Sequence, residues 1–142
     1  MQVDNILQSK GAEVYTVPTG GPVAEAVRML NERRIGAVVV TDEAGAVAGI
    51  LSERDIVRHL SGDPAALLAS PVSSIMTKTV ITCGRDASVS ELMEQMTRYR
   101  IRHIPIVEGN ALVGIVSIGD VVKRKIEETE QEALALREYI AS

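Results

Sequence analysis

The sequence predicts a mixed α/β fold: one β-α-β-β-α unit occurs twice, the copies pack about a pseudo-two-fold axis, and a long helix follows. Three observations predict it: an internal repeat, an aliphatic composition without Phe or Trp, and a helical apolar spacing that continues past the second copy. Because one unit of about 60 residues buries too little apolar surface alone, the two copies are expected to pack sheet against sheet.

The repeat appears when the sequence is shifted by 66 residues and, after one deletion, by 65. Before the deletion the matching residues are Val14, Thr16, Val23, Glu25, Arg34 and Ile35 with Val80, Thr82, Val89, Glu91, Arg100 and Ile101. The deletion itself lies in a Gly-containing segment between two apolar runs, which is typical of a hairpin turn. The repeat therefore respects the boundaries of the expected elements.

Each copy predicts the same elements in the same order. The expected strands are Val14–Val17, Ala37–Thr41 and Val47–Leu51 in the first copy and Val80–Thr82, His103–Val107 and Leu112–Val116 in the second. Pro22 stands near the first position of the first long helix, and Ser88 with Glu91 predicts a capping box at its counterpart. Apolar positions at helical spacing are expected to be buried: Val23, Ala26, Val27 and Leu30, and Val89, Leu92, Met93 and Met96.

The expected boundaries are 1–62 for the first repeat, 63–71 for a connector with a short Ala/Leu helix, 72–128 for the second repeat and 129–142 for a helical extension. A similar pentad introduces each copy, Val3–Leu7 and Val72–Met76. The last helix has an apolar seam formed by Val122, Ile126, Thr129, Ala133, Leu136 and Ile140. Packing on its own domain explains only the first half of this seam, and a dimer contact is the other interpretation of the rest.

Composition excludes several classes of function. A net charge of −4 and only three aromatic residues argue against a nucleic-acid partner. The polar N-terminus and the lack of an apolar run of about 18 residues predict neither a leader nor a membrane span, so we expect a cytoplasmic protein. The single Cys83 allows no intrachain disulfide and fits a reducing compartment, where it is expected to be a small buried side chain.

Two heptads, Gly49–Asp55 and Gly114–Asp120, each end a strand and begin a helix. Ser52 and Ser117 are expected to cap these helices, with an Asp three residues on. A binding role is compatible with this structural one, because a helix N-terminus attracts phosphate and a carboxylate one turn in can accept ribose hydroxyls.

The repeated unit, the Val-x-x-Ile-(Leu/Met) lead-in, the segment Arg102–Val107 and the two Gly-x-x-Ser-x-x-Asp heptads together resemble a pair of cystathionine β-synthase (CBS) domains, a stand-alone Bateman module. The resemblance spans about Val3 to Ile126. It implies that adenosine-containing ligands (AMP, ADP or ATP, with NAD or S-adenosylmethionine as alternatives) bind in two clefts between the repeats, and it implies no catalytic cofactor and no metal.

The resemblance also implies roles for individual residues. In each cleft the heptad Ser meets phosphate and the heptad Asp meets ribose, which assigns Ser52 and Asp55 to one cleft and Ser117 and Asp120 to the other. Adenine contacts come from the first strand and the second heptad residue: Tyr15 and Ile50, and Ile81 and Ile115. The segment before each middle strand crosses to the neighbouring cleft and brings Gly36, Arg102 and His103 near phosphates.

The two clefts are not expected to be equal. Gly36 stands where the second copy has Arg102, and Arg54 stands where the second heptad has Gly119. We therefore predict stronger binding of a charged nucleotide in the cleft with Ser52, Asp55, Arg102 and His103.

The leading function is a nucleotide sensor that acts on an unidentified protein partner and forms a homodimer. The alternative is a structural protein that dimerises and has degenerate, unoccupied clefts. An enzyme is the third possibility and is not favoured, because the sequence shows no paired acid and base, activated nucleophile or metal set.

Overall fold

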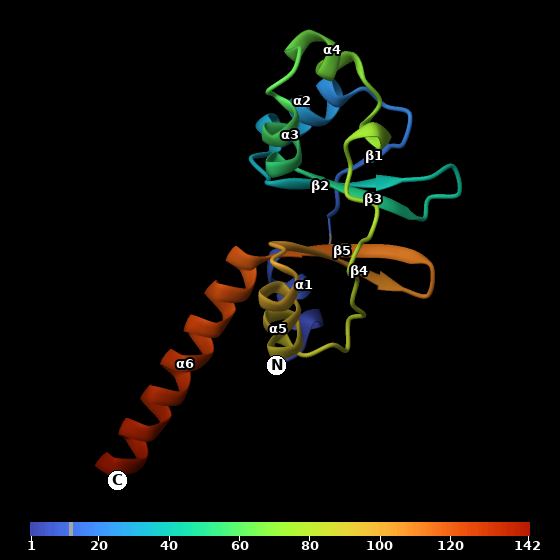
Figure 1. Ribbon diagram of the computed structural model, residues 1–142. Coiled ribbons are helices and arrows are strands. Elements are labelled where there is room, and N and C mark those ends of the chain that lie inside the picture. The colour runs from blue at the N-terminus through green and yellow to red at the C-terminus, as the bar shows by residue number, and fades with distance from the viewer. Residues whose placement is uncertain (12) are drawn as a thin grey trace.

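A computed structural model describes residues 1–11 and 13–142 and contains two units, each with a small sheet. The sheets face each other across the middle of the molecule, and helices cover their outer sides (Figure 1). This arrangement confirms the predicted fold class of two α/β repeats related by a pseudo-two-fold axis, followed by a long C-terminal helix.

The first unit contains β1 (Thr16–Pro18), α2 (Val23–Arg33), β2 (Ala37–Thr41), β3 (Val47–Ser52) and α3 (Glu53–His59). Its sheet has the order β1-β2-β3, with β1 parallel and β3 antiparallel to β2. Strand β1 begins two residues later than predicted. Pro22 directly precedes α2, near the first helical position as predicted. The connector that follows contains α4 (Pro64–Ala69), and the 3₁₀ helix η1 (Val72–Ser74) lies in the pentad that introduces the second repeat.

The second unit contains α5 (Val89–Tyr99), β4 (His103–Glu108), β5 (Ala111–Ser117) and α6 (Ile118–Ala141). The strand predicted at Val80–Thr82 is wrong: these residues are in no strand, and the isolated bridge nearby joins Cys83 to Ile106. The reason is a proline. In the first unit the backbone N–H of Val39 donates to the carbonyl of Tyr15 at 3.4 Å, but its counterpart in the second unit is Pro105, which has no N–H to donate.

The long helices largely follow the predicted pattern. The capping box of Ser88 and Glu91 is present at the start of α5. Most of the expected inward positions are buried, although Val27 is only half-buried. Met93 is 37% exposed, against expectation, because it lies with Glu94, Thr97 and Arg98 at a surface hollow.

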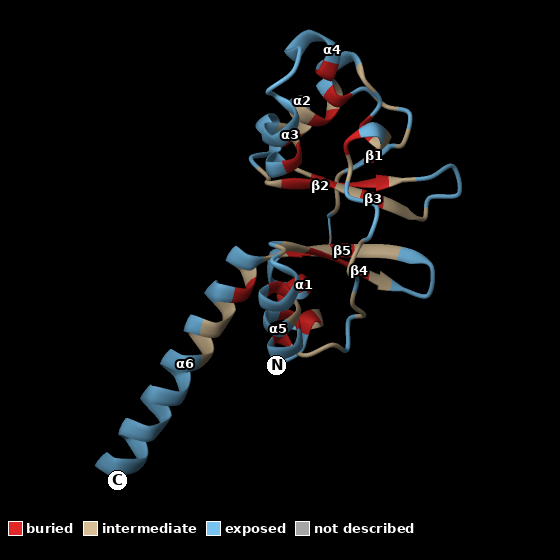
Figure 2. Ribbon diagram, viewed as in Figure 1, coloured by how far each residue is buried: buried red, intermediate tan, exposed pale blue. Residues whose placement is uncertain are grey.

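The two units exchange their lead-in segments. Helix α1 (Val3–Lys10) precedes the first unit in sequence, yet its Val3, Ile6 and Leu7 belong to the core of the second unit. Leu67, Val72 and Ile75, which precede the second unit, belong to the core of the first. Each core is thus completed by residues from the other half of the chain, and the buried residues lie between each sheet and its helices (Figure 2).

Backbone hydrogen bonds fix this exchange in the same way on both sides. The N–H of Val3 donates to the carbonyl of Ala87, and the N–H of Val72 donates to the carbonyl of Gly21, both at 2.8 Å. These two bonds are equivalent under the repeat, so the pseudo-two-fold relation extends to the lead-in segments.

Helix α6 leaves the body of the molecule (Figures 1 and 2). Val121 is its one buried residue among those the structure describes, and every residue from Thr129 onward is exposed. The predicted seam is therefore uncovered within the chain, with Leu136 58% and Ile140 74% exposed.

Candidate functional site

The two heptads form the same local structure at the ends of β3 and β5. Ser52 caps α3: its hydroxyl accepts from the N–H of Asp55 at 3.3 Å, and its own N–H donates to Asp55 Oδ2 at 2.9 Å. Ser117 and Asp120 repeat this capping box at α6, with distances of 3.2 and 2.9 Å. Each carboxylate is held rigidly beside a helix N-terminus, where the amide groups favour an anion.

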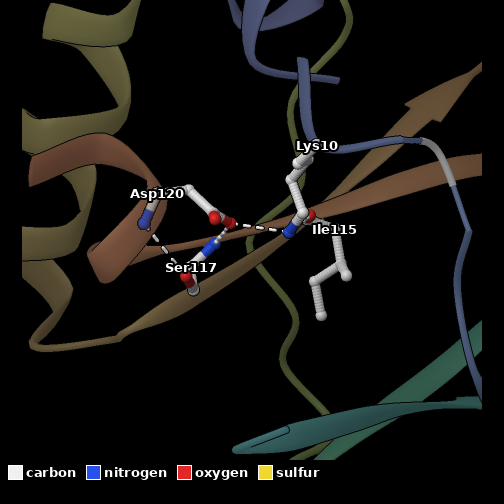
Figure 3. A network of polar contacts seen from close by, with 4 residues as sticks. All are labelled: Lys10, Ile115, Ser117 and Asp120. Atoms are coloured by element: carbon white, nitrogen blue, oxygen red, sulfur yellow. Dashed lines mark hydrogen bonds and ion pairs between the residues drawn. The ribbon is translucent and has the colours of Figure 1, made fainter. Parts of the chain in front are cut away.

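A residue that follows each exchanged pentad contacts the carboxylate: Thr77, directly after Met76, or Lys10, at the end of α1. In the first unit the hydroxyl of Thr77 donates to Asp55 Oδ1 at 3.2 Å. In the second unit the ammonium of Lys10 donates to Asp120 Oδ2 at 2.6 Å and to the carbonyl oxygen of Ile115 at 3.0 Å (Figure 3). We missed both Lys10 and Thr77 from the sequence, because the repeat register does not reveal that lead-ins are exchanged.

The two carboxylates consequently have different electrostatic environments. Asp55 is buried, with 7% of its surface exposed, and is the one buried charged residue in the described part of the chain. Asp120 is less buried. Burial alone would raise the pKa of Asp120, but hydrogen bonds from the Lys10 ammonium and the Ser117 N–H outweigh it and hold that pKa below its usual value.

His103 reaches the opposite unit near the pseudo-two-fold axis. A Cβ on Gly36 would lie 3.1 Å from Cε1 of the His103 ring, so the absence of a side chain at Gly36 makes room for the imidazole. Burial and the nearby Lys10 lower the pKa of His103, and Arg102 adds to this, against the opposing charges of Asp120 and Glu53. The imidazole is therefore neutral at neutral pH.

Arg102 lies close to the start of α6, the last helix of its own unit. Its carbonyl accepts from the N–H of Ile118 at 2.8 Å, just as the carbonyl of Gly36 accepts from the N–H of Glu53 at 3.0 Å. Arg102 also lines an open groove of about 730 Å³ together with residues of the first half of α6: Ile118, Gly119, Val122, Lys123, Ile126 and Glu127. This groove does not include Ser117 or Asp120.

The expected adenine-contacting residues are half-buried, and two of them, Ile50 and Ile115, lie in strands. Ile50 stands opposite Val39 in β2, and Tyr15 directly precedes β1, on the other side of that strand. The Tyr15 ring packs on the first core, and the Arg33 guanidinium lies 4.8 Å from its centroid. Ile115 stands opposite Pro105. Ile81 lies in the segment that is not a strand, and Arg54 is exposed in the first turn of α3.

Other reactive groups have structural surroundings. Cys83 donates to Gln95 Oε1 at 3.0 Å, and burial together with the nearby Glu91 raises the pKa of its thiol, which disfavours the thiolate. Within residues 1–11 and 13–142, His, Cys, Asp and Glu side chains form no group of three or more that could hold a metal ion. The same residues include no helix both long and apolar enough to cross a membrane.

Two consecutive segments, residues 7–62 and 72–127, match the family model of the CBS domain. The chain belongs to the CBS-domain family. It is 34% identical over 146 residues to the mitochondrial CBS domain-containing protein CBSX3 of Arabidopsis thaliana, covering 97% of this chain and 71% of that protein. The CBS pair is a regulatory module.

Solved CBS structures have the same fold. The CBS-domain protein ATU1752 from Agrobacterium tumefaciens superposes with a TM-score of 0.83 at 46% identity, covering 87% of this chain and 92% of that one. The CBS domain pair of protein MJ0100, in complex with 5′-methylthioadenosine and S-adenosyl-L-methionine, has a TM-score of 0.80 at 26% identity. That match covers 90% of this chain and 98% of the other.

Proposed function

We propose that this CBS pair is a sensor of an adenosine-containing ligand. The ligand binds in one or both clefts, at Ser52 with Asp55 and at Ser117 with Asp120, and alters the shape or oligomeric contacts through which the module regulates a protein partner. The observation that carries the proposal is the paired capping box, which holds one carboxylate at each helix N-terminus. The MJ0100 pair, in complex with two adenosine derivatives, supports the ligand class.

The chemistry of the two heptads suits such a ligand. A carboxylate accepts the two hydroxyls of a ribose, and the adjacent helix N-terminus attracts a phosphate. Half-buried aliphatic side chains at Ile50 and Ile115 offer an apolar surface to adenine. AMP, ADP and ATP are the first candidates, followed by NAD and S-adenosylmethionine.

We also propose that the clefts are unequal and that the first, with Ser52 and Asp55, binds a charged nucleotide more tightly. The position of His103 beside Gly36 supports the proposal that His103, from the second unit, contributes to this first cleft. Arg102, which is exposed, is assigned to the same cleft by the resemblance to CBS pairs, although its lining of the α6 groove gives that assignment less support.

Thermal unfolding with AMP, ADP, ATP, NAD and S-adenosylmethionine tests the sensor function. A ligand that binds only the folded state raises the melting temperature. Asp55→Asn and Asp120→Asn, which keep a side-chain oxygen for capping, then rank the clefts: we expect the larger loss of nucleotide affinity for Asp55→Asn. A flat response to all five ligands at millimolar concentration would contradict the sensor function, and equal losses would contradict the ranking.

One observation favours a second function, dimerisation. From Thr129 onward α6 is exposed and carries apolar side chains at Leu136 and Ile140. A helical extension without tertiary contacts is marginal in water, so a second copy of the chain is the proposed partner for this segment. The mass of the full chain in solution tests this.

We further propose that the protein is not an enzyme and that it resides in the cytoplasm. The raised pKa of Cys83 argues against a nucleophilic thiol, and the single cysteine fits a reducing compartment. Product analysis after incubation with ATP or NAD tests the first statement.

A further inference from the structure

The same two acceptors recur at both proposed clefts but receive different donors. In the first cleft the acceptors are the carbonyl of Ile50 and the carboxylate of Asp55, and Thr77 supplies both donors: its backbone N–H at 2.9 Å and its hydroxyl at 3.2 Å. In the second cleft the equivalent acceptors belong to Ile115 and Asp120. One group, the ammonium of Lys10, donates to both.

This difference changes both the charge and the mobility of the donor. Thr77 is neutral and fixed, because its backbone also accepts from the N–H of Ile50 at 3.0 Å. Lys10 carries a full positive charge at the end of α1, and 32% of its side chain is exposed. An ammonium has three donors on a flexible stem, so it can leave one acceptor for another nearby.

We propose that Lys10 makes the second cleft selective for anionic adenosine ligands over uncharged ones, an inference that rests on the proposed function. When ribose hydroxyls bind Asp120, they compete with the Lys10 ammonium for the carboxylate. A phosphate on the ligand supplies a new partner for that ammonium, whereas adenosine supplies none. Leaving a partly buried charge without its partner is costly, so Lys10 opposes adenosine and favours AMP.

In the first cleft no lysine ammonium donates to the carboxylate, because Thr77 takes that place. When ribose hydroxyls reach Asp55, the group they meet there is the Thr77 hydroxyl, which is uncharged and can reorient as donor or acceptor. Any preference of the first cleft for a ligand with a phosphate therefore does not depend on the residue that donates to its carboxylate. The two clefts of one chain then differ in what they discriminate as well as in affinity.

Calorimetric titration with AMP and with adenosine tests the role of Lys10. Asp55→Asn provides the background, because it weakens the first cleft and leaves the second to be measured. In this background we expect Lys10→Met to lower the preference for AMP over adenosine about tenfold, the effect of losing one charged hydrogen bond. Lys10→Gln should do the same, and Lys10→Arg should retain the preference.

Lys78→Met is the matched control, since it removes a lysine of equal charge that is exposed in the lead-in to the second unit. We expect it to leave the AMP preference unchanged. If both ligands bind and Lys10→Met leaves the preference unchanged, or if Lys78→Met lowers it equally, the role of Lys10 is wrong and the sensor function stands. If the unsubstituted chain binds neither AMP nor adenosine nor any of the other candidate ligands, the sensor function fails, and the role of Lys10 fails with it.

Discussion

Gly49 lies against the backbone of Thr77 so closely that an added Cβ would stand 2.9 Å from the Thr77 carbonyl oxygen. The same Cβ would stand 2.5 Å from the Sδ atom of Met76. Glycine is required here because the lead-in of the second repeat crosses β3 at this point, where Ile50 and Thr77 exchange two backbone hydrogen bonds.

Gly49→Ala should therefore lower the free energy of unfolding by about 1–3 kcal/mol, since the Thr77 backbone has to shift. Gly114→Ala is the matched control at the equivalent position, where the added Cβ would meet only the Leu7 side chain, 2.6 Å from its Cδ2 atom. A side-chain methyl can rotate away, so we expect a smaller loss. Urea unfolding of both variants measures the difference, and the reverse order would contradict it.

Thr77→Val should lower the free energy of unfolding by about 1 kcal/mol, because it removes a hydroxyl that donates to the buried Asp55 at nearly constant volume. Thr79→Val, two residues on at an exposed position, should change stability little. Urea unfolding at pH 7 compares the two. Equal stability of both variants would mean that the Thr77 hydroxyl contributes nothing.

Stability should fall as the pH drops below about 6.5, the ordinary pKa of histidine. Burial, Lys10 and Arg102 hold the pKa of His103 lower than this in the folded state, despite Asp120 and Glu53. The unfolded chain therefore binds the proton first, and protonation favours unfolding as the pH falls toward the folded pKa.

His103→Gln should reduce this loss between pH 7 and pH 5. Well above pH 7 the imidazole is neutral in both states, so the substitution should not alter the slope of stability against pH there. Urea unfolding at a series of pH values measures both ranges. An unchanged slope between pH 7 and pH 5 would show that His103 does not cause the dependence.

At a concentration where the full chain is monomeric, removal of residues 129–142 should change the unfolding midpoint of the body little, because this segment is exposed throughout within one chain. We expect the full chain to sediment as a dimer and the shortened chain as a monomer. Leu136→Asp, on the apolar seam, should also give a monomer, and Leu134→Asp, beside the seam, should weaken the dimer less. A monomeric full chain would contradict the dimer.

Local chemistry made much of this structure predictable. The capping boxes at Ser52, Ser88 and Ser117 are each specified within four residues, and the repeat register located the hairpins and both heptads. The loss of the strand at Val80–Thr82 had a signal as well: Pro105 stands in the middle strand that should have donated to it.

The partners of the two carboxylates could not be predicted in this way. Lys10 is 110 residues from Asp120 in sequence, and Thr77 is 22 residues from Asp55. Both contacts depend on which unit each lead-in enters. The apolar residues Val3, Ile6 and Leu7 fit either core equally well on hydrophobicity alone. That choice is made by tertiary packing, which periodicity does not report.

A chain with a single copy of this unit would have a lead-in segment and no second core to receive it. Two such chains would complete each other by swapping these segments symmetrically, as homodimers exchange identical elements. When a connector such as residues 63–71 joins two units, the same lead-in segments are exchanged within one chain instead of between two chains. Only the fused form lets each half change separately, so the first half can have Gly36 where the second half has Arg102.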